Sequence, residues 1–318
     1  MKIVVIEPLG VEKEQLLSIA EEKLPKSAEL VCYDTRVTDT EILIERGRDA
    51  DVVVVANLPL NGQVIRGFQK LKLLSVAFTG VDHIDLEACR EKGVTVCNCA
   101  GYSTVAVADL VFGMLLSLYR NIPACNEAVR REGTKDGLVG FELAGKKFGI
   151  VGTGAIGLRV ARLAHAFGCE VYAYSRTEKE IDWVHYMPLE ELLGTCDIVS
   201  LHTPLTKETH HLICRENLAL MKKSAVLINT ARGPVVDSEA LAEALNQGKI
   251  AGAAVDVFET EPPVSKDHPL FHAKNTLVTP HVAFATKEAM VKRAHIAFQN
   301  VKAWQEGSSE CHRRAIKR

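Results

Sequence analysis

Short apolar runs alternate with amphipathic segments along almost the whole chain, and this alternation limits the folds open to it. Runs with the length and composition of buried strands include KIVVI, DVVVVA, KKFGIV, EVYAYS and AVLIN. The segments between them have apolar residues at helical spacing, which gives the rhythm of parallel strands covered by helices on both faces. The alternation therefore predicts an α/β architecture.

The runs form two sets, and 318 residues are enough for two domains with separate cores. Between the sets lies STVAVADLVFGMLLSLYRNI, which is apolar around nearly its whole circumference and predicts a helix buried between domains or at a subunit contact. A late helix, KEAMVKRAHIAFQNVKAWQ, has one apolar stripe, and we expect it to return to the first domain. We predict two doubly wound parallel-sheet domains, with residues 101–283 inserted between residues 1–100 and 284–318.

Composition argues against several classes of protein. The 38 basic and 40 acidic residues give a net charge of −2, which offers no attraction for nucleic acid or an anionic membrane. No apolar run approaches the roughly 20 residues that cross a bilayer, and the first residues lack the features of a secretion signal. The nine cysteines are scattered and lack zinc-site spacing. We expect a cytoplasmic protein without nucleic-acid or membrane partners.

The segment KKFGIVGTGAIGLRVARLAHAFGCEVYAYSR has the glycine spacing of a dinucleotide-binding turn. It follows an apolar strand and precedes an amphipathic helix. In such a turn the first glycine permits the tight bend, the second lets backbone approach a pyrophosphate at the helix N-terminus, and the third lets the helix pack on the strand. The turn predicted to hold the cofactor consists of Gly152, Gly154, Ala155, Ile156 and Gly157.

The second strand of this segment ends in YAYSRT, where a site that prefers NAD usually has an acidic residue. Ser175, Arg176 and Thr177 stand there instead. A guanidinium can pair with a 2′-phosphate and two hydroxyls can donate to it, whereas a carboxylate would repel it. These residues favour NADP over NAD; the alternative is that Arg176 is an exposed loop residue indifferent to the cofactor.

Three further strand ends have residues capable of chemistry: Arg232 in NTARGPV, Glu261 in DVFETEPP and His281 in TPHVAFAT. Taken singly, they could be a surface charge, a solvated turn residue and a half-buried histidine. Taken together they are meaningful, because ligands of open α/β sheets collect at the strand ends. We expect the three to act at one site.

The order of GTGAIG, NTARG, DVFETEP and TPH resembles that of the NAD(P)-dependent D-2-hydroxyacid dehydrogenase family over nearly the whole chain. FTGVDHIDL, NCAGYSTVAVADL and HTPLTKETHHLI also resemble family segments in their expected places. The resemblance implies a Rossmann cofactor domain inserted into a flavodoxin-like substrate domain. It also implies hydride transfer from NADPH or NADH to a 2-oxo acid, giving the D-hydroxy acid, in a homodimer joined through the cofactor domain.

The resemblance assigns a role to each of the three strand-end residues. Arg232 would grip the carboxylate of the 2-oxo acid by a bidentate pair, and its permanent charge would polarise the neighbouring carbonyl. His281 would be the general acid during reduction and the base in the reverse direction. Glu261 would hydrogen-bond the imidazole, orient it and raise its pKa.

Further contacts follow from the resemblance alone. On the substrate side they are a pocket wall at Leu58 and backbone N–H groups at Gly80 and Val81. On the nicotinamide side they are Thr104, Thr230, Ala231 and Asp256. On the adenosine side they are Thr203, Pro204 and Thr209. The nearby His202, His210 and His211 lack acidic companions, and we expect no metal.

Two departures from the family pattern affect the interpretation. Ala100 replaces a common proline, which alters loop stiffness, and Phe284 occupies a position where small residues or tryptophan are frequent, which leaves the substrate size open. The YSRT segment resembles that of glyoxylate and hydroxypyruvate reductases, so these small acids are the first expected substrates. A bulkier branched or aromatic 2-oxo acid is the nearest alternative. A co-repressor that binds NAD(H) is another, distinguished by long flanking segments.

Overall fold

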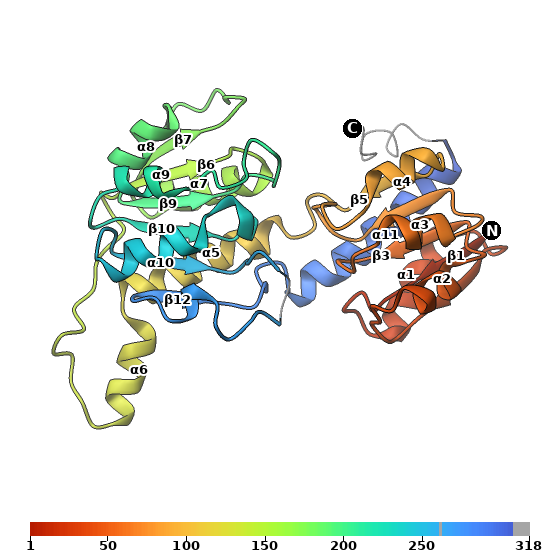
Figure 1. Ribbon diagram of the computed structural model, residues 1–318, viewed down its shortest axis with the longest axis horizontal. Helices are drawn as coiled ribbons and strands as arrows, with labels where there is room; N and C mark the ends of the chain where they lie inside the picture. The colour runs from red at the N-terminus through yellow and green to blue at the C-terminus, as the bar shows by residue number, and fades with distance from the viewer. Residues whose placement is uncertain (261–262, 308–318) are drawn as a thin grey trace. The chain divides into compact units, whose positions relative to one another are not determined.

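The computed structural model describes residues 1–260 and 263–307, and the chain divides into two compact units (Figure 1). The first unit contains Met1–Ser103 and the chain from Ala285 onward, and the second unit is Thr104–Phe284. Both are built on a parallel sheet with helices, so the predicted α/β fold class is confirmed. That the first binds the substrate and the second the dinucleotide stays a prediction at this stage.

The first unit has a five-stranded parallel sheet in the order β2-β1-β3-β4-β5, a doubly wound order of the flavodoxin type. Its strands are β1 (Lys2–Val5), β2 (Glu29–Cys32), β3 (Val52–Val55), β4 (Leu73–Val76) and β5 (Thr95–Asn98). Its helices are α1 (Lys13–Lys23), α2 (Thr40–Gly47), α3 (Gly62–Gly67), α4 (Leu86–Glu91) and α11 (Lys287–Gln305).

The core of the first unit lies on both faces of this sheet. Every residue of β3, which reads VVVV, is buried, as expected for a strand covered on both sides. Four helices begin at side chains that accept from backbone N–H groups: Asp39, Asn61, Asp85 and Thr286. The late helix α11 packs beneath β4, where the Ser75 hydroxyl donates to the carbonyl of Ala297 at 3.0 Å.

The second unit has a seven-stranded parallel sheet in the order β12-β11-β10-β9-β6-β7-β8. Its first strand in the sequence lies inside the sheet and the later strands extend from both of its sides, which is the Rossmann order. The strands are β6 (Lys147–Val151), β7 (Glu170–Tyr174), β8 (Val184–Tyr186), β9 (Ile198–Leu201), β10 (Val226–Asn229), β11 (Gly252–Val255) and β12 (Thr276–Val278).

The helices of the second unit cover both faces of its sheet, with one apolar cluster on each face. The α-helices are α5 (Thr104–Tyr119), α6 (Ile122–Arg130), α7 (Ala155–Ala166), α8 (Leu189–Thr195), α9 (Arg215–Leu220) and α10 (Ser238–Asn246). Two short 3-10 helices are η1 (Gly233–Val235) and η2 (Pro269–Phe271). The faces meet different helices: α5 and α7 contribute to one cluster, and α8, α9 and α10 to the other.

The apolar helix between the two predicted sets is shorter than the sequence pattern suggests. It ends at Tyr119, because Asn121 adopts a left-handed φ of 52° and Pro123 stands at the start of the next helix. Most of α5 is buried against the sheet of its own unit, around Phe148. By contrast, α6 has no buried residue and extends away from the sheet of the second unit (Figure 1).

No single helix among the described residues is both long and apolar enough to cross a membrane. Only α5 and α6 taken as a pair have that length and composition, and they are bent by 54° at the break between them.

Candidate functional site

Groups that could bind a dinucleotide or a carboxylate line one edge of the second unit's sheet. Because all its strands are parallel, their carboxyl ends lie at the same edge. In order across the sheet from β12 to β7, the residues that follow these ends are His281, Asp256, Arg232, Thr203, Gly152 and Ser175. The sheet thus brings together groups that are far apart in the sequence.

The glycine turn after β6 has the geometry that its spacing predicts. Gly152 has a φ of +98°, and a Cβ there would lie 2.8 Å from the carbonyl oxygen of His202. A Cβ at Gly157 would collide with the carbonyl of Gly152, so the helix packs closely on the turn. A Cβ at Gly154, where α7 begins, would meet nothing within 4 Å. The protein leaves open space at the one glycine that should face a pyrophosphate.

The loop after β7 is hydrogen-bonded to this turn. The Thr153 backbone N–H donates to the Ser175 hydroxyl and its side chain donates to the carbonyl of Thr177, both at 3.4 Å. Arg176 between them is exposed. The pKa of Glu208 is lowered, chiefly by a hydrogen bond from Thr206 and to a smaller extent by the charge of Arg176. The predicted reader of the 2′-phosphate therefore lies within electrostatic reach of the loop after β9.

That loop contains the predicted adenosine contacts and is braced by one of them. The Thr209 hydroxyl donates to the carbonyl of Pro204 at 2.6 Å and accepts from the backbone N–H of Thr206 at 2.7 Å. Just before the loop, the His202 ring lies 2.9 Å from the Ser200 hydroxyl, and burial lowers the pKa of His202 to about 3. His202 is therefore neutral at physiological pH and adds no charge to the site.

Two buried hydroxyls at this edge, Thr203 Oγ1 and Thr230 Oγ1, have no hydrogen-bond partner among the described residues. Buried polar atoms are nearly always paired, by protein, water or ligand. Thr203 follows β9, the neighbour of the strand that leads into the glycine turn, and Thr230 follows β10, one strand further across the sheet. Both were predicted to touch the cofactor. Together with the open space at Gly154, these atoms fit a bound dinucleotide.

The turn after β10 fixes the backbone of Arg232. The buried Asn229 side chain accepts from the N–H of Ala231 at 3.1 Å and donates to the carbonyl of Arg232 at 2.9 Å. A Cβ at Gly233 would collide with the backbone of Phe258, so the loops after β10 and β11 pack against each other. Asn229 was not among the residues predicted from the sequence, although an asparagine that ends a buried strand is a signal for such a turn.

Asp256 after β11 holds the loop that contains His281. Its buried carboxylate accepts from the Thr279 hydroxyl at 2.5 Å and from the N–H groups of Val282 and Ala283 at 2.9 Å each. Its carbonyl accepts from the N–H of His281 at 2.8 Å. Burial raises the pKa of Asp256, while these hydrogen bonds act in the opposite direction. From the sequence, Asp256 was predicted only to contact the nicotinamide, and that contact stays a prediction. Its role in holding this loop was not predicted.

His281 itself is half-buried and has a left-handed φ of 56°. Residues held in this sparsely populated region cluster at functional sites. Its ring lies edge-on to Phe284, with 5.2 Å between the centroids. Glu261, the predicted partner of this imidazole, lies outside the described residues.

The predicted substrate contacts of the first unit follow β3 and β4 at the carboxyl edge of its own sheet. Gly80 and Val81 are half-buried there, whereas Leu58 is fully buried. Because the Leu58 side chain has no exposed surface, its predicted contact with the substrate stays a prediction. Thr104, a predicted nicotinamide contact, is the first residue of α5.

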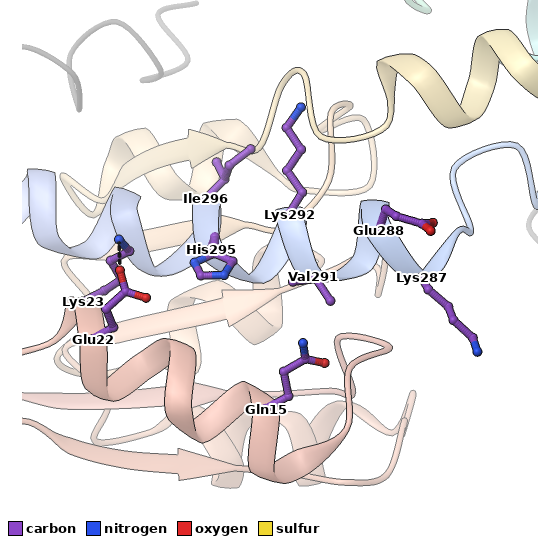
Figure 2. Close-up of a pocket in the computed structure, with 9 residues that line it drawn as sticks. All are labelled: Gln15, Glu22, Lys23, Lys287, Glu288, Val291, Lys292, His295 and Ile296. Atoms are coloured by element: carbon purple, nitrogen blue, oxygen red, sulfur yellow. Dashed lines mark hydrogen bonds and ion pairs between the residues drawn. The ribbon is translucent and has the colours of Figure 1, made fainter.

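The first unit also has a surface groove between α1 and α11, of about 860 Å³ (Figure 2). Its lining includes charged side chains of both signs, and two of them, Lys23 and Glu22, pair with each other at 2.7 Å. These helices cover the sheet rather than standing at its carboxyl edge, so we do not place the site there. In the described parts of both units, no three His, Cys, Asp or Glu side chains are grouped to hold a metal ion.

Comparison with protein families identifies the second unit. Residues 112–283 match the model of the D-isomer specific 2-hydroxyacid dehydrogenase, NAD binding domain. The chain is 40% identical over 311 residues to a D-3-phosphoglycerate dehydrogenase of Methanocaldococcus jannaschii, covering 95% of this chain and 57% of that protein. It therefore spans little more than half of that relative's length.

Two relatives whose length is close to that of this chain are a glyoxylate reductase and a hydroxypyruvate reductase. A glyoxylate reductase of Thermococcus litoralis is 39% identical over 287 residues, covering 86% of each chain. A hydroxypyruvate reductase of Thermotoga maritima is 37% identical over 292 residues, covering 91% of this chain and 93% of that one.

Two solved structures share the fold over the whole chain. A D-lactate dehydrogenase of Aquifex aeolicus, complexed with NAD and lactic acid, has a TM-score of 0.86 at 31% identity and 99% coverage of both chains. An acyclic imino acid reductase in complex with NADPH and D-Arg has a TM-score of 0.89 at 28% identity and full coverage.

Proposed function

The chain belongs to the D-isomer specific 2-hydroxyacid dehydrogenase family, and from this premise we propose that it reduces glyoxylate to glycolate and hydroxypyruvate to D-glycerate. The observation that carries the proposal is the series of groups at one sheet edge: a glycine turn with open space, a fixed arginine and a histidine in a braced loop. Groups of these kinds would bind a dinucleotide, hold a carboxylate and move a proton.

The glycine turn and the start of α7 would hold the pyrophosphate, and the hydroxyls of Thr203 and Thr230 would pair with other parts of the cofactor. When bound, the nicotinamide supplies the hydride in reduction and accepts it in the reverse direction. The rest of the chemistry is positioning, charge stabilisation and proton transfer by the chain's own residues.

Arg232 would bind the substrate carboxylate with two parallel N–H donors of its guanidinium. Asn229 limits the freedom of the backbone at Arg232, which favours one orientation of the bound acid. The positive charge beside the carbonyl oxygen would stabilise the negative charge that develops there during reduction.

His281 would donate the proton that completes the alcohol, from an imidazole nitrogen to the developing alkoxide. The Asp256 carboxylate holds the loop on both sides of this histidine, which keeps the ring position reproducible. Glu261 would hydrogen-bond the other ring nitrogen and orient the imidazole toward the substrate.

We further propose that NADPH is preferred to NADH. The loop after β7 offers two hydroxyls and the exposed Arg176 where an acidic residue would favour NAD. Among the similar structures, one enzyme is bound to NADPH and another to NAD, so this fold accommodates both.

A homodimer joined through the second unit is proposed as well. Helix α6 has no buried residue, and Ile122, Val129 and Phe141 in and after it are 50%, 69% and 63% exposed. Exposed apolar side chains that follow one another along one segment of chain favour an interaction surface there. We expect light scattering to give the mass of two chains, and V129E to give one; a single-chain mass for the wild type would contradict the proposal.

The cytoplasm is the proposed location. Eight described cysteines are all free thiols, which fits a reducing compartment better than an oxidising one. Recovery of the protein with the soluble fraction of gently lysed cells, apart from the secreted proteins, would support this location.

The test of the function is a matrix of initial rates, followed by loss of reduced-nicotinamide absorbance. NADPH and NADH would each be combined with glyoxylate, hydroxypyruvate, pyruvate, 2-oxoisocaproate and phenylpyruvate. We expect NADPH with the first two acids to give the highest kcat/KM. A preference for the bulky acids would replace the proposed substrate, and no turnover with any pair would contradict the enzymatic function.

A further inference from the structure

Glu7 follows β1 at the carboxyl edge of the first unit's sheet and is buried, with 1% of the residue exposed. Both oxygens of its carboxylate nevertheless accept hydrogen bonds. One oxygen accepts from the backbone N–H groups of Ala56 at 2.8 Å and Leu58 at 2.9 Å, and the other accepts from Arg36 at 2.6 Å. Burying a carboxylate is unfavourable unless it is paired and hydrogen-bonded, so this side chain is committed to the loop after β3.

Arg36, in the loop after β2, contacts the same loop. The nitrogen that donates to Glu7 also donates to the Asn57 side chain at 2.8 Å, and the second terminal nitrogen donates to the Asn57 carbonyl at 3.4 Å. Three successive residues, Ala56–Leu58, are therefore hydrogen-bonded to one ion pair. Backbone pairing within the sheet accounts for none of these bonds, because β3 ends at Val55.

The position of Arg36 is itself fixed by Arg46 of α2. Arg46 donates to the carbonyls of Ile6 at 3.0 Å and Thr35 at 2.7 Å, and its guanidinium lies 4.2 Å from the ring centroid of Tyr33. Ile6 precedes Glu7 and Thr35 precedes Arg36, so Arg46 connects the backbone next to each member of the ion pair to α2. These contacts limit the movement of the ion pair.

The loop after β4, which contains Gly80 and Val81, is bonded to the loop after β3. The ring nitrogen Nε2 of His83 donates to the carbonyl of Ala56 at 3.0 Å, and the backbone N–H of Leu60 donates to the carbonyl of His83 at 3.0 Å. Any displacement of the loop after β3 would therefore be transmitted to the loop after β4. Both loops contain the substrate contacts predicted from the sequence.

We propose that Glu7 and Arg36 are positioning residues for the 2-oxo acid. They hold the Ala56–Leu58 loop, and through His83 the Gly80–Val81 loop, in the shape that receives the substrate. This inference rests on the proposed function, and neither residue touches the reacting atoms. Because the ion pair is in the first unit and the glycine turn is in the second, loss of the pair should weaken binding of the acid and leave binding of the cofactor unchanged.

The test is a set of variants with steady-state kinetics for glyoxylate and NADPH. R36M removes both donors to Asn57 and the guanidinium that is hydrogen-bonded to Glu7, whereas R36K keeps the charge and loses the planar fork. R66M is the matched control, since it breaks an ion pair with Glu91 of 2.9 Å in the same unit, at the surface. If R36M does not fold, R36K decides the question.

We expect R36M to raise the KM for glyoxylate about tenfold and R36K about threefold, with the KM for NADPH unchanged, as for loss of substrate binding alone. R66M should match the wild type in all constants. Faster amide hydrogen exchange at Ala56 and Leu58 in R36M should accompany the change in KM. A glyoxylate KM within twofold of the wild type in R36M and R36K would overturn the inference, as would an equal rise in both KM values. Such results leave the proposed function standing, whereas an inactive wild type would remove both.

Discussion

Replacing Gly154 with alanine tests the cofactor site without disturbing the protein. The residue has a φ of −71° and a ψ of −171°, a conformation that alanine adopts freely, and the added methyl would meet no atom within 4 Å. Alanine is a poorer N-cap residue than glycine, so we expect the free energy of unfolding of G154A to be about 1 kcal/mol lower than that of the wild type, too little to unfold the protein.

The effect on cofactor binding follows from the same open space. If the pyrophosphate lies against this backbone, the methyl group would separate it from the N–H groups at the start of α7. A hydrogen bond to a charged group contributes roughly 1.5–3 kcal/mol, so the dissociation constant of NADPH should rise about 10- to 100-fold. G157A is the contrasting change, since its methyl would collide with the carbonyl of Gly152 and should destabilise the fold itself.

The assay is a fluorescence titration of NADPH together with denaturant unfolding of each variant. G194A is the control, because its methyl would have only an ordinary contact of 3.7 Å with the carbonyl of Leu220, away from the turn. An NADPH dissociation constant for G154A within twofold of the wild type would refute the placement of the pyrophosphate at this turn.

Three further predictions concern the other parts of the site. Replacing His281 with alanine should lower kcat by about 10²- to 10⁴-fold while the NADPH dissociation constant is kept, as expected for a general acid; near-normal turnover would exclude this role. R176A should weaken NADPH binding about tenfold and leave NADH unchanged, measured by paired titrations; equal effects on both cofactors would show that Arg176 does not read the 2′-phosphate. Burial lowers the pKa of His202 to about 3, below its unfolded value, so the contribution of this group to stability is present above about pH 6.5 and is lost as the pH falls. Between pH 6 and 4, the free energy of unfolding of the wild type should therefore fall more steeply than that of H202Q, by up to about 1.4 kcal/mol per pH unit, in denaturant titrations. Identical slopes would contradict the low pKa.

Much of the fold could be predicted because short stretches of sequence indicate each strand, helix and turn. Alternating apolar runs identify strands and helices one segment at a time, and the glycine spacing specifies a turn whose φ and close approaches the structure reproduces at Gly152 and Gly157. The break after Tyr119 was missed, although NIP carries its signal: asparagine takes the left-handed conformation and proline starts the next helix.

Two of the three bracing residues could not be found in this way. Asn229 bonds only residues two and three positions further on and could have been recognised, whereas Asp256 and Glu7 act through hydrogen bonds to loops whose positions follow only from the sheet order. Glu7 and its partners Ala56 and Leu58 are separated by 49 and 51 positions, and no local pattern connects them. A charged residue next to a buried strand looks the same in sequence whether it is solvated or holds the neighbouring loop.

The configuration of the product tests the central claim most directly. The purified protein would be incubated with NADPH and hydroxypyruvate, and the glycerate formed would be resolved on a chiral column. The account predicts D-glycerate formed in equal amount to the NADPH consumed. L-glycerate, or no consumption of NADPH with either hydroxypyruvate or glyoxylate, would contradict it.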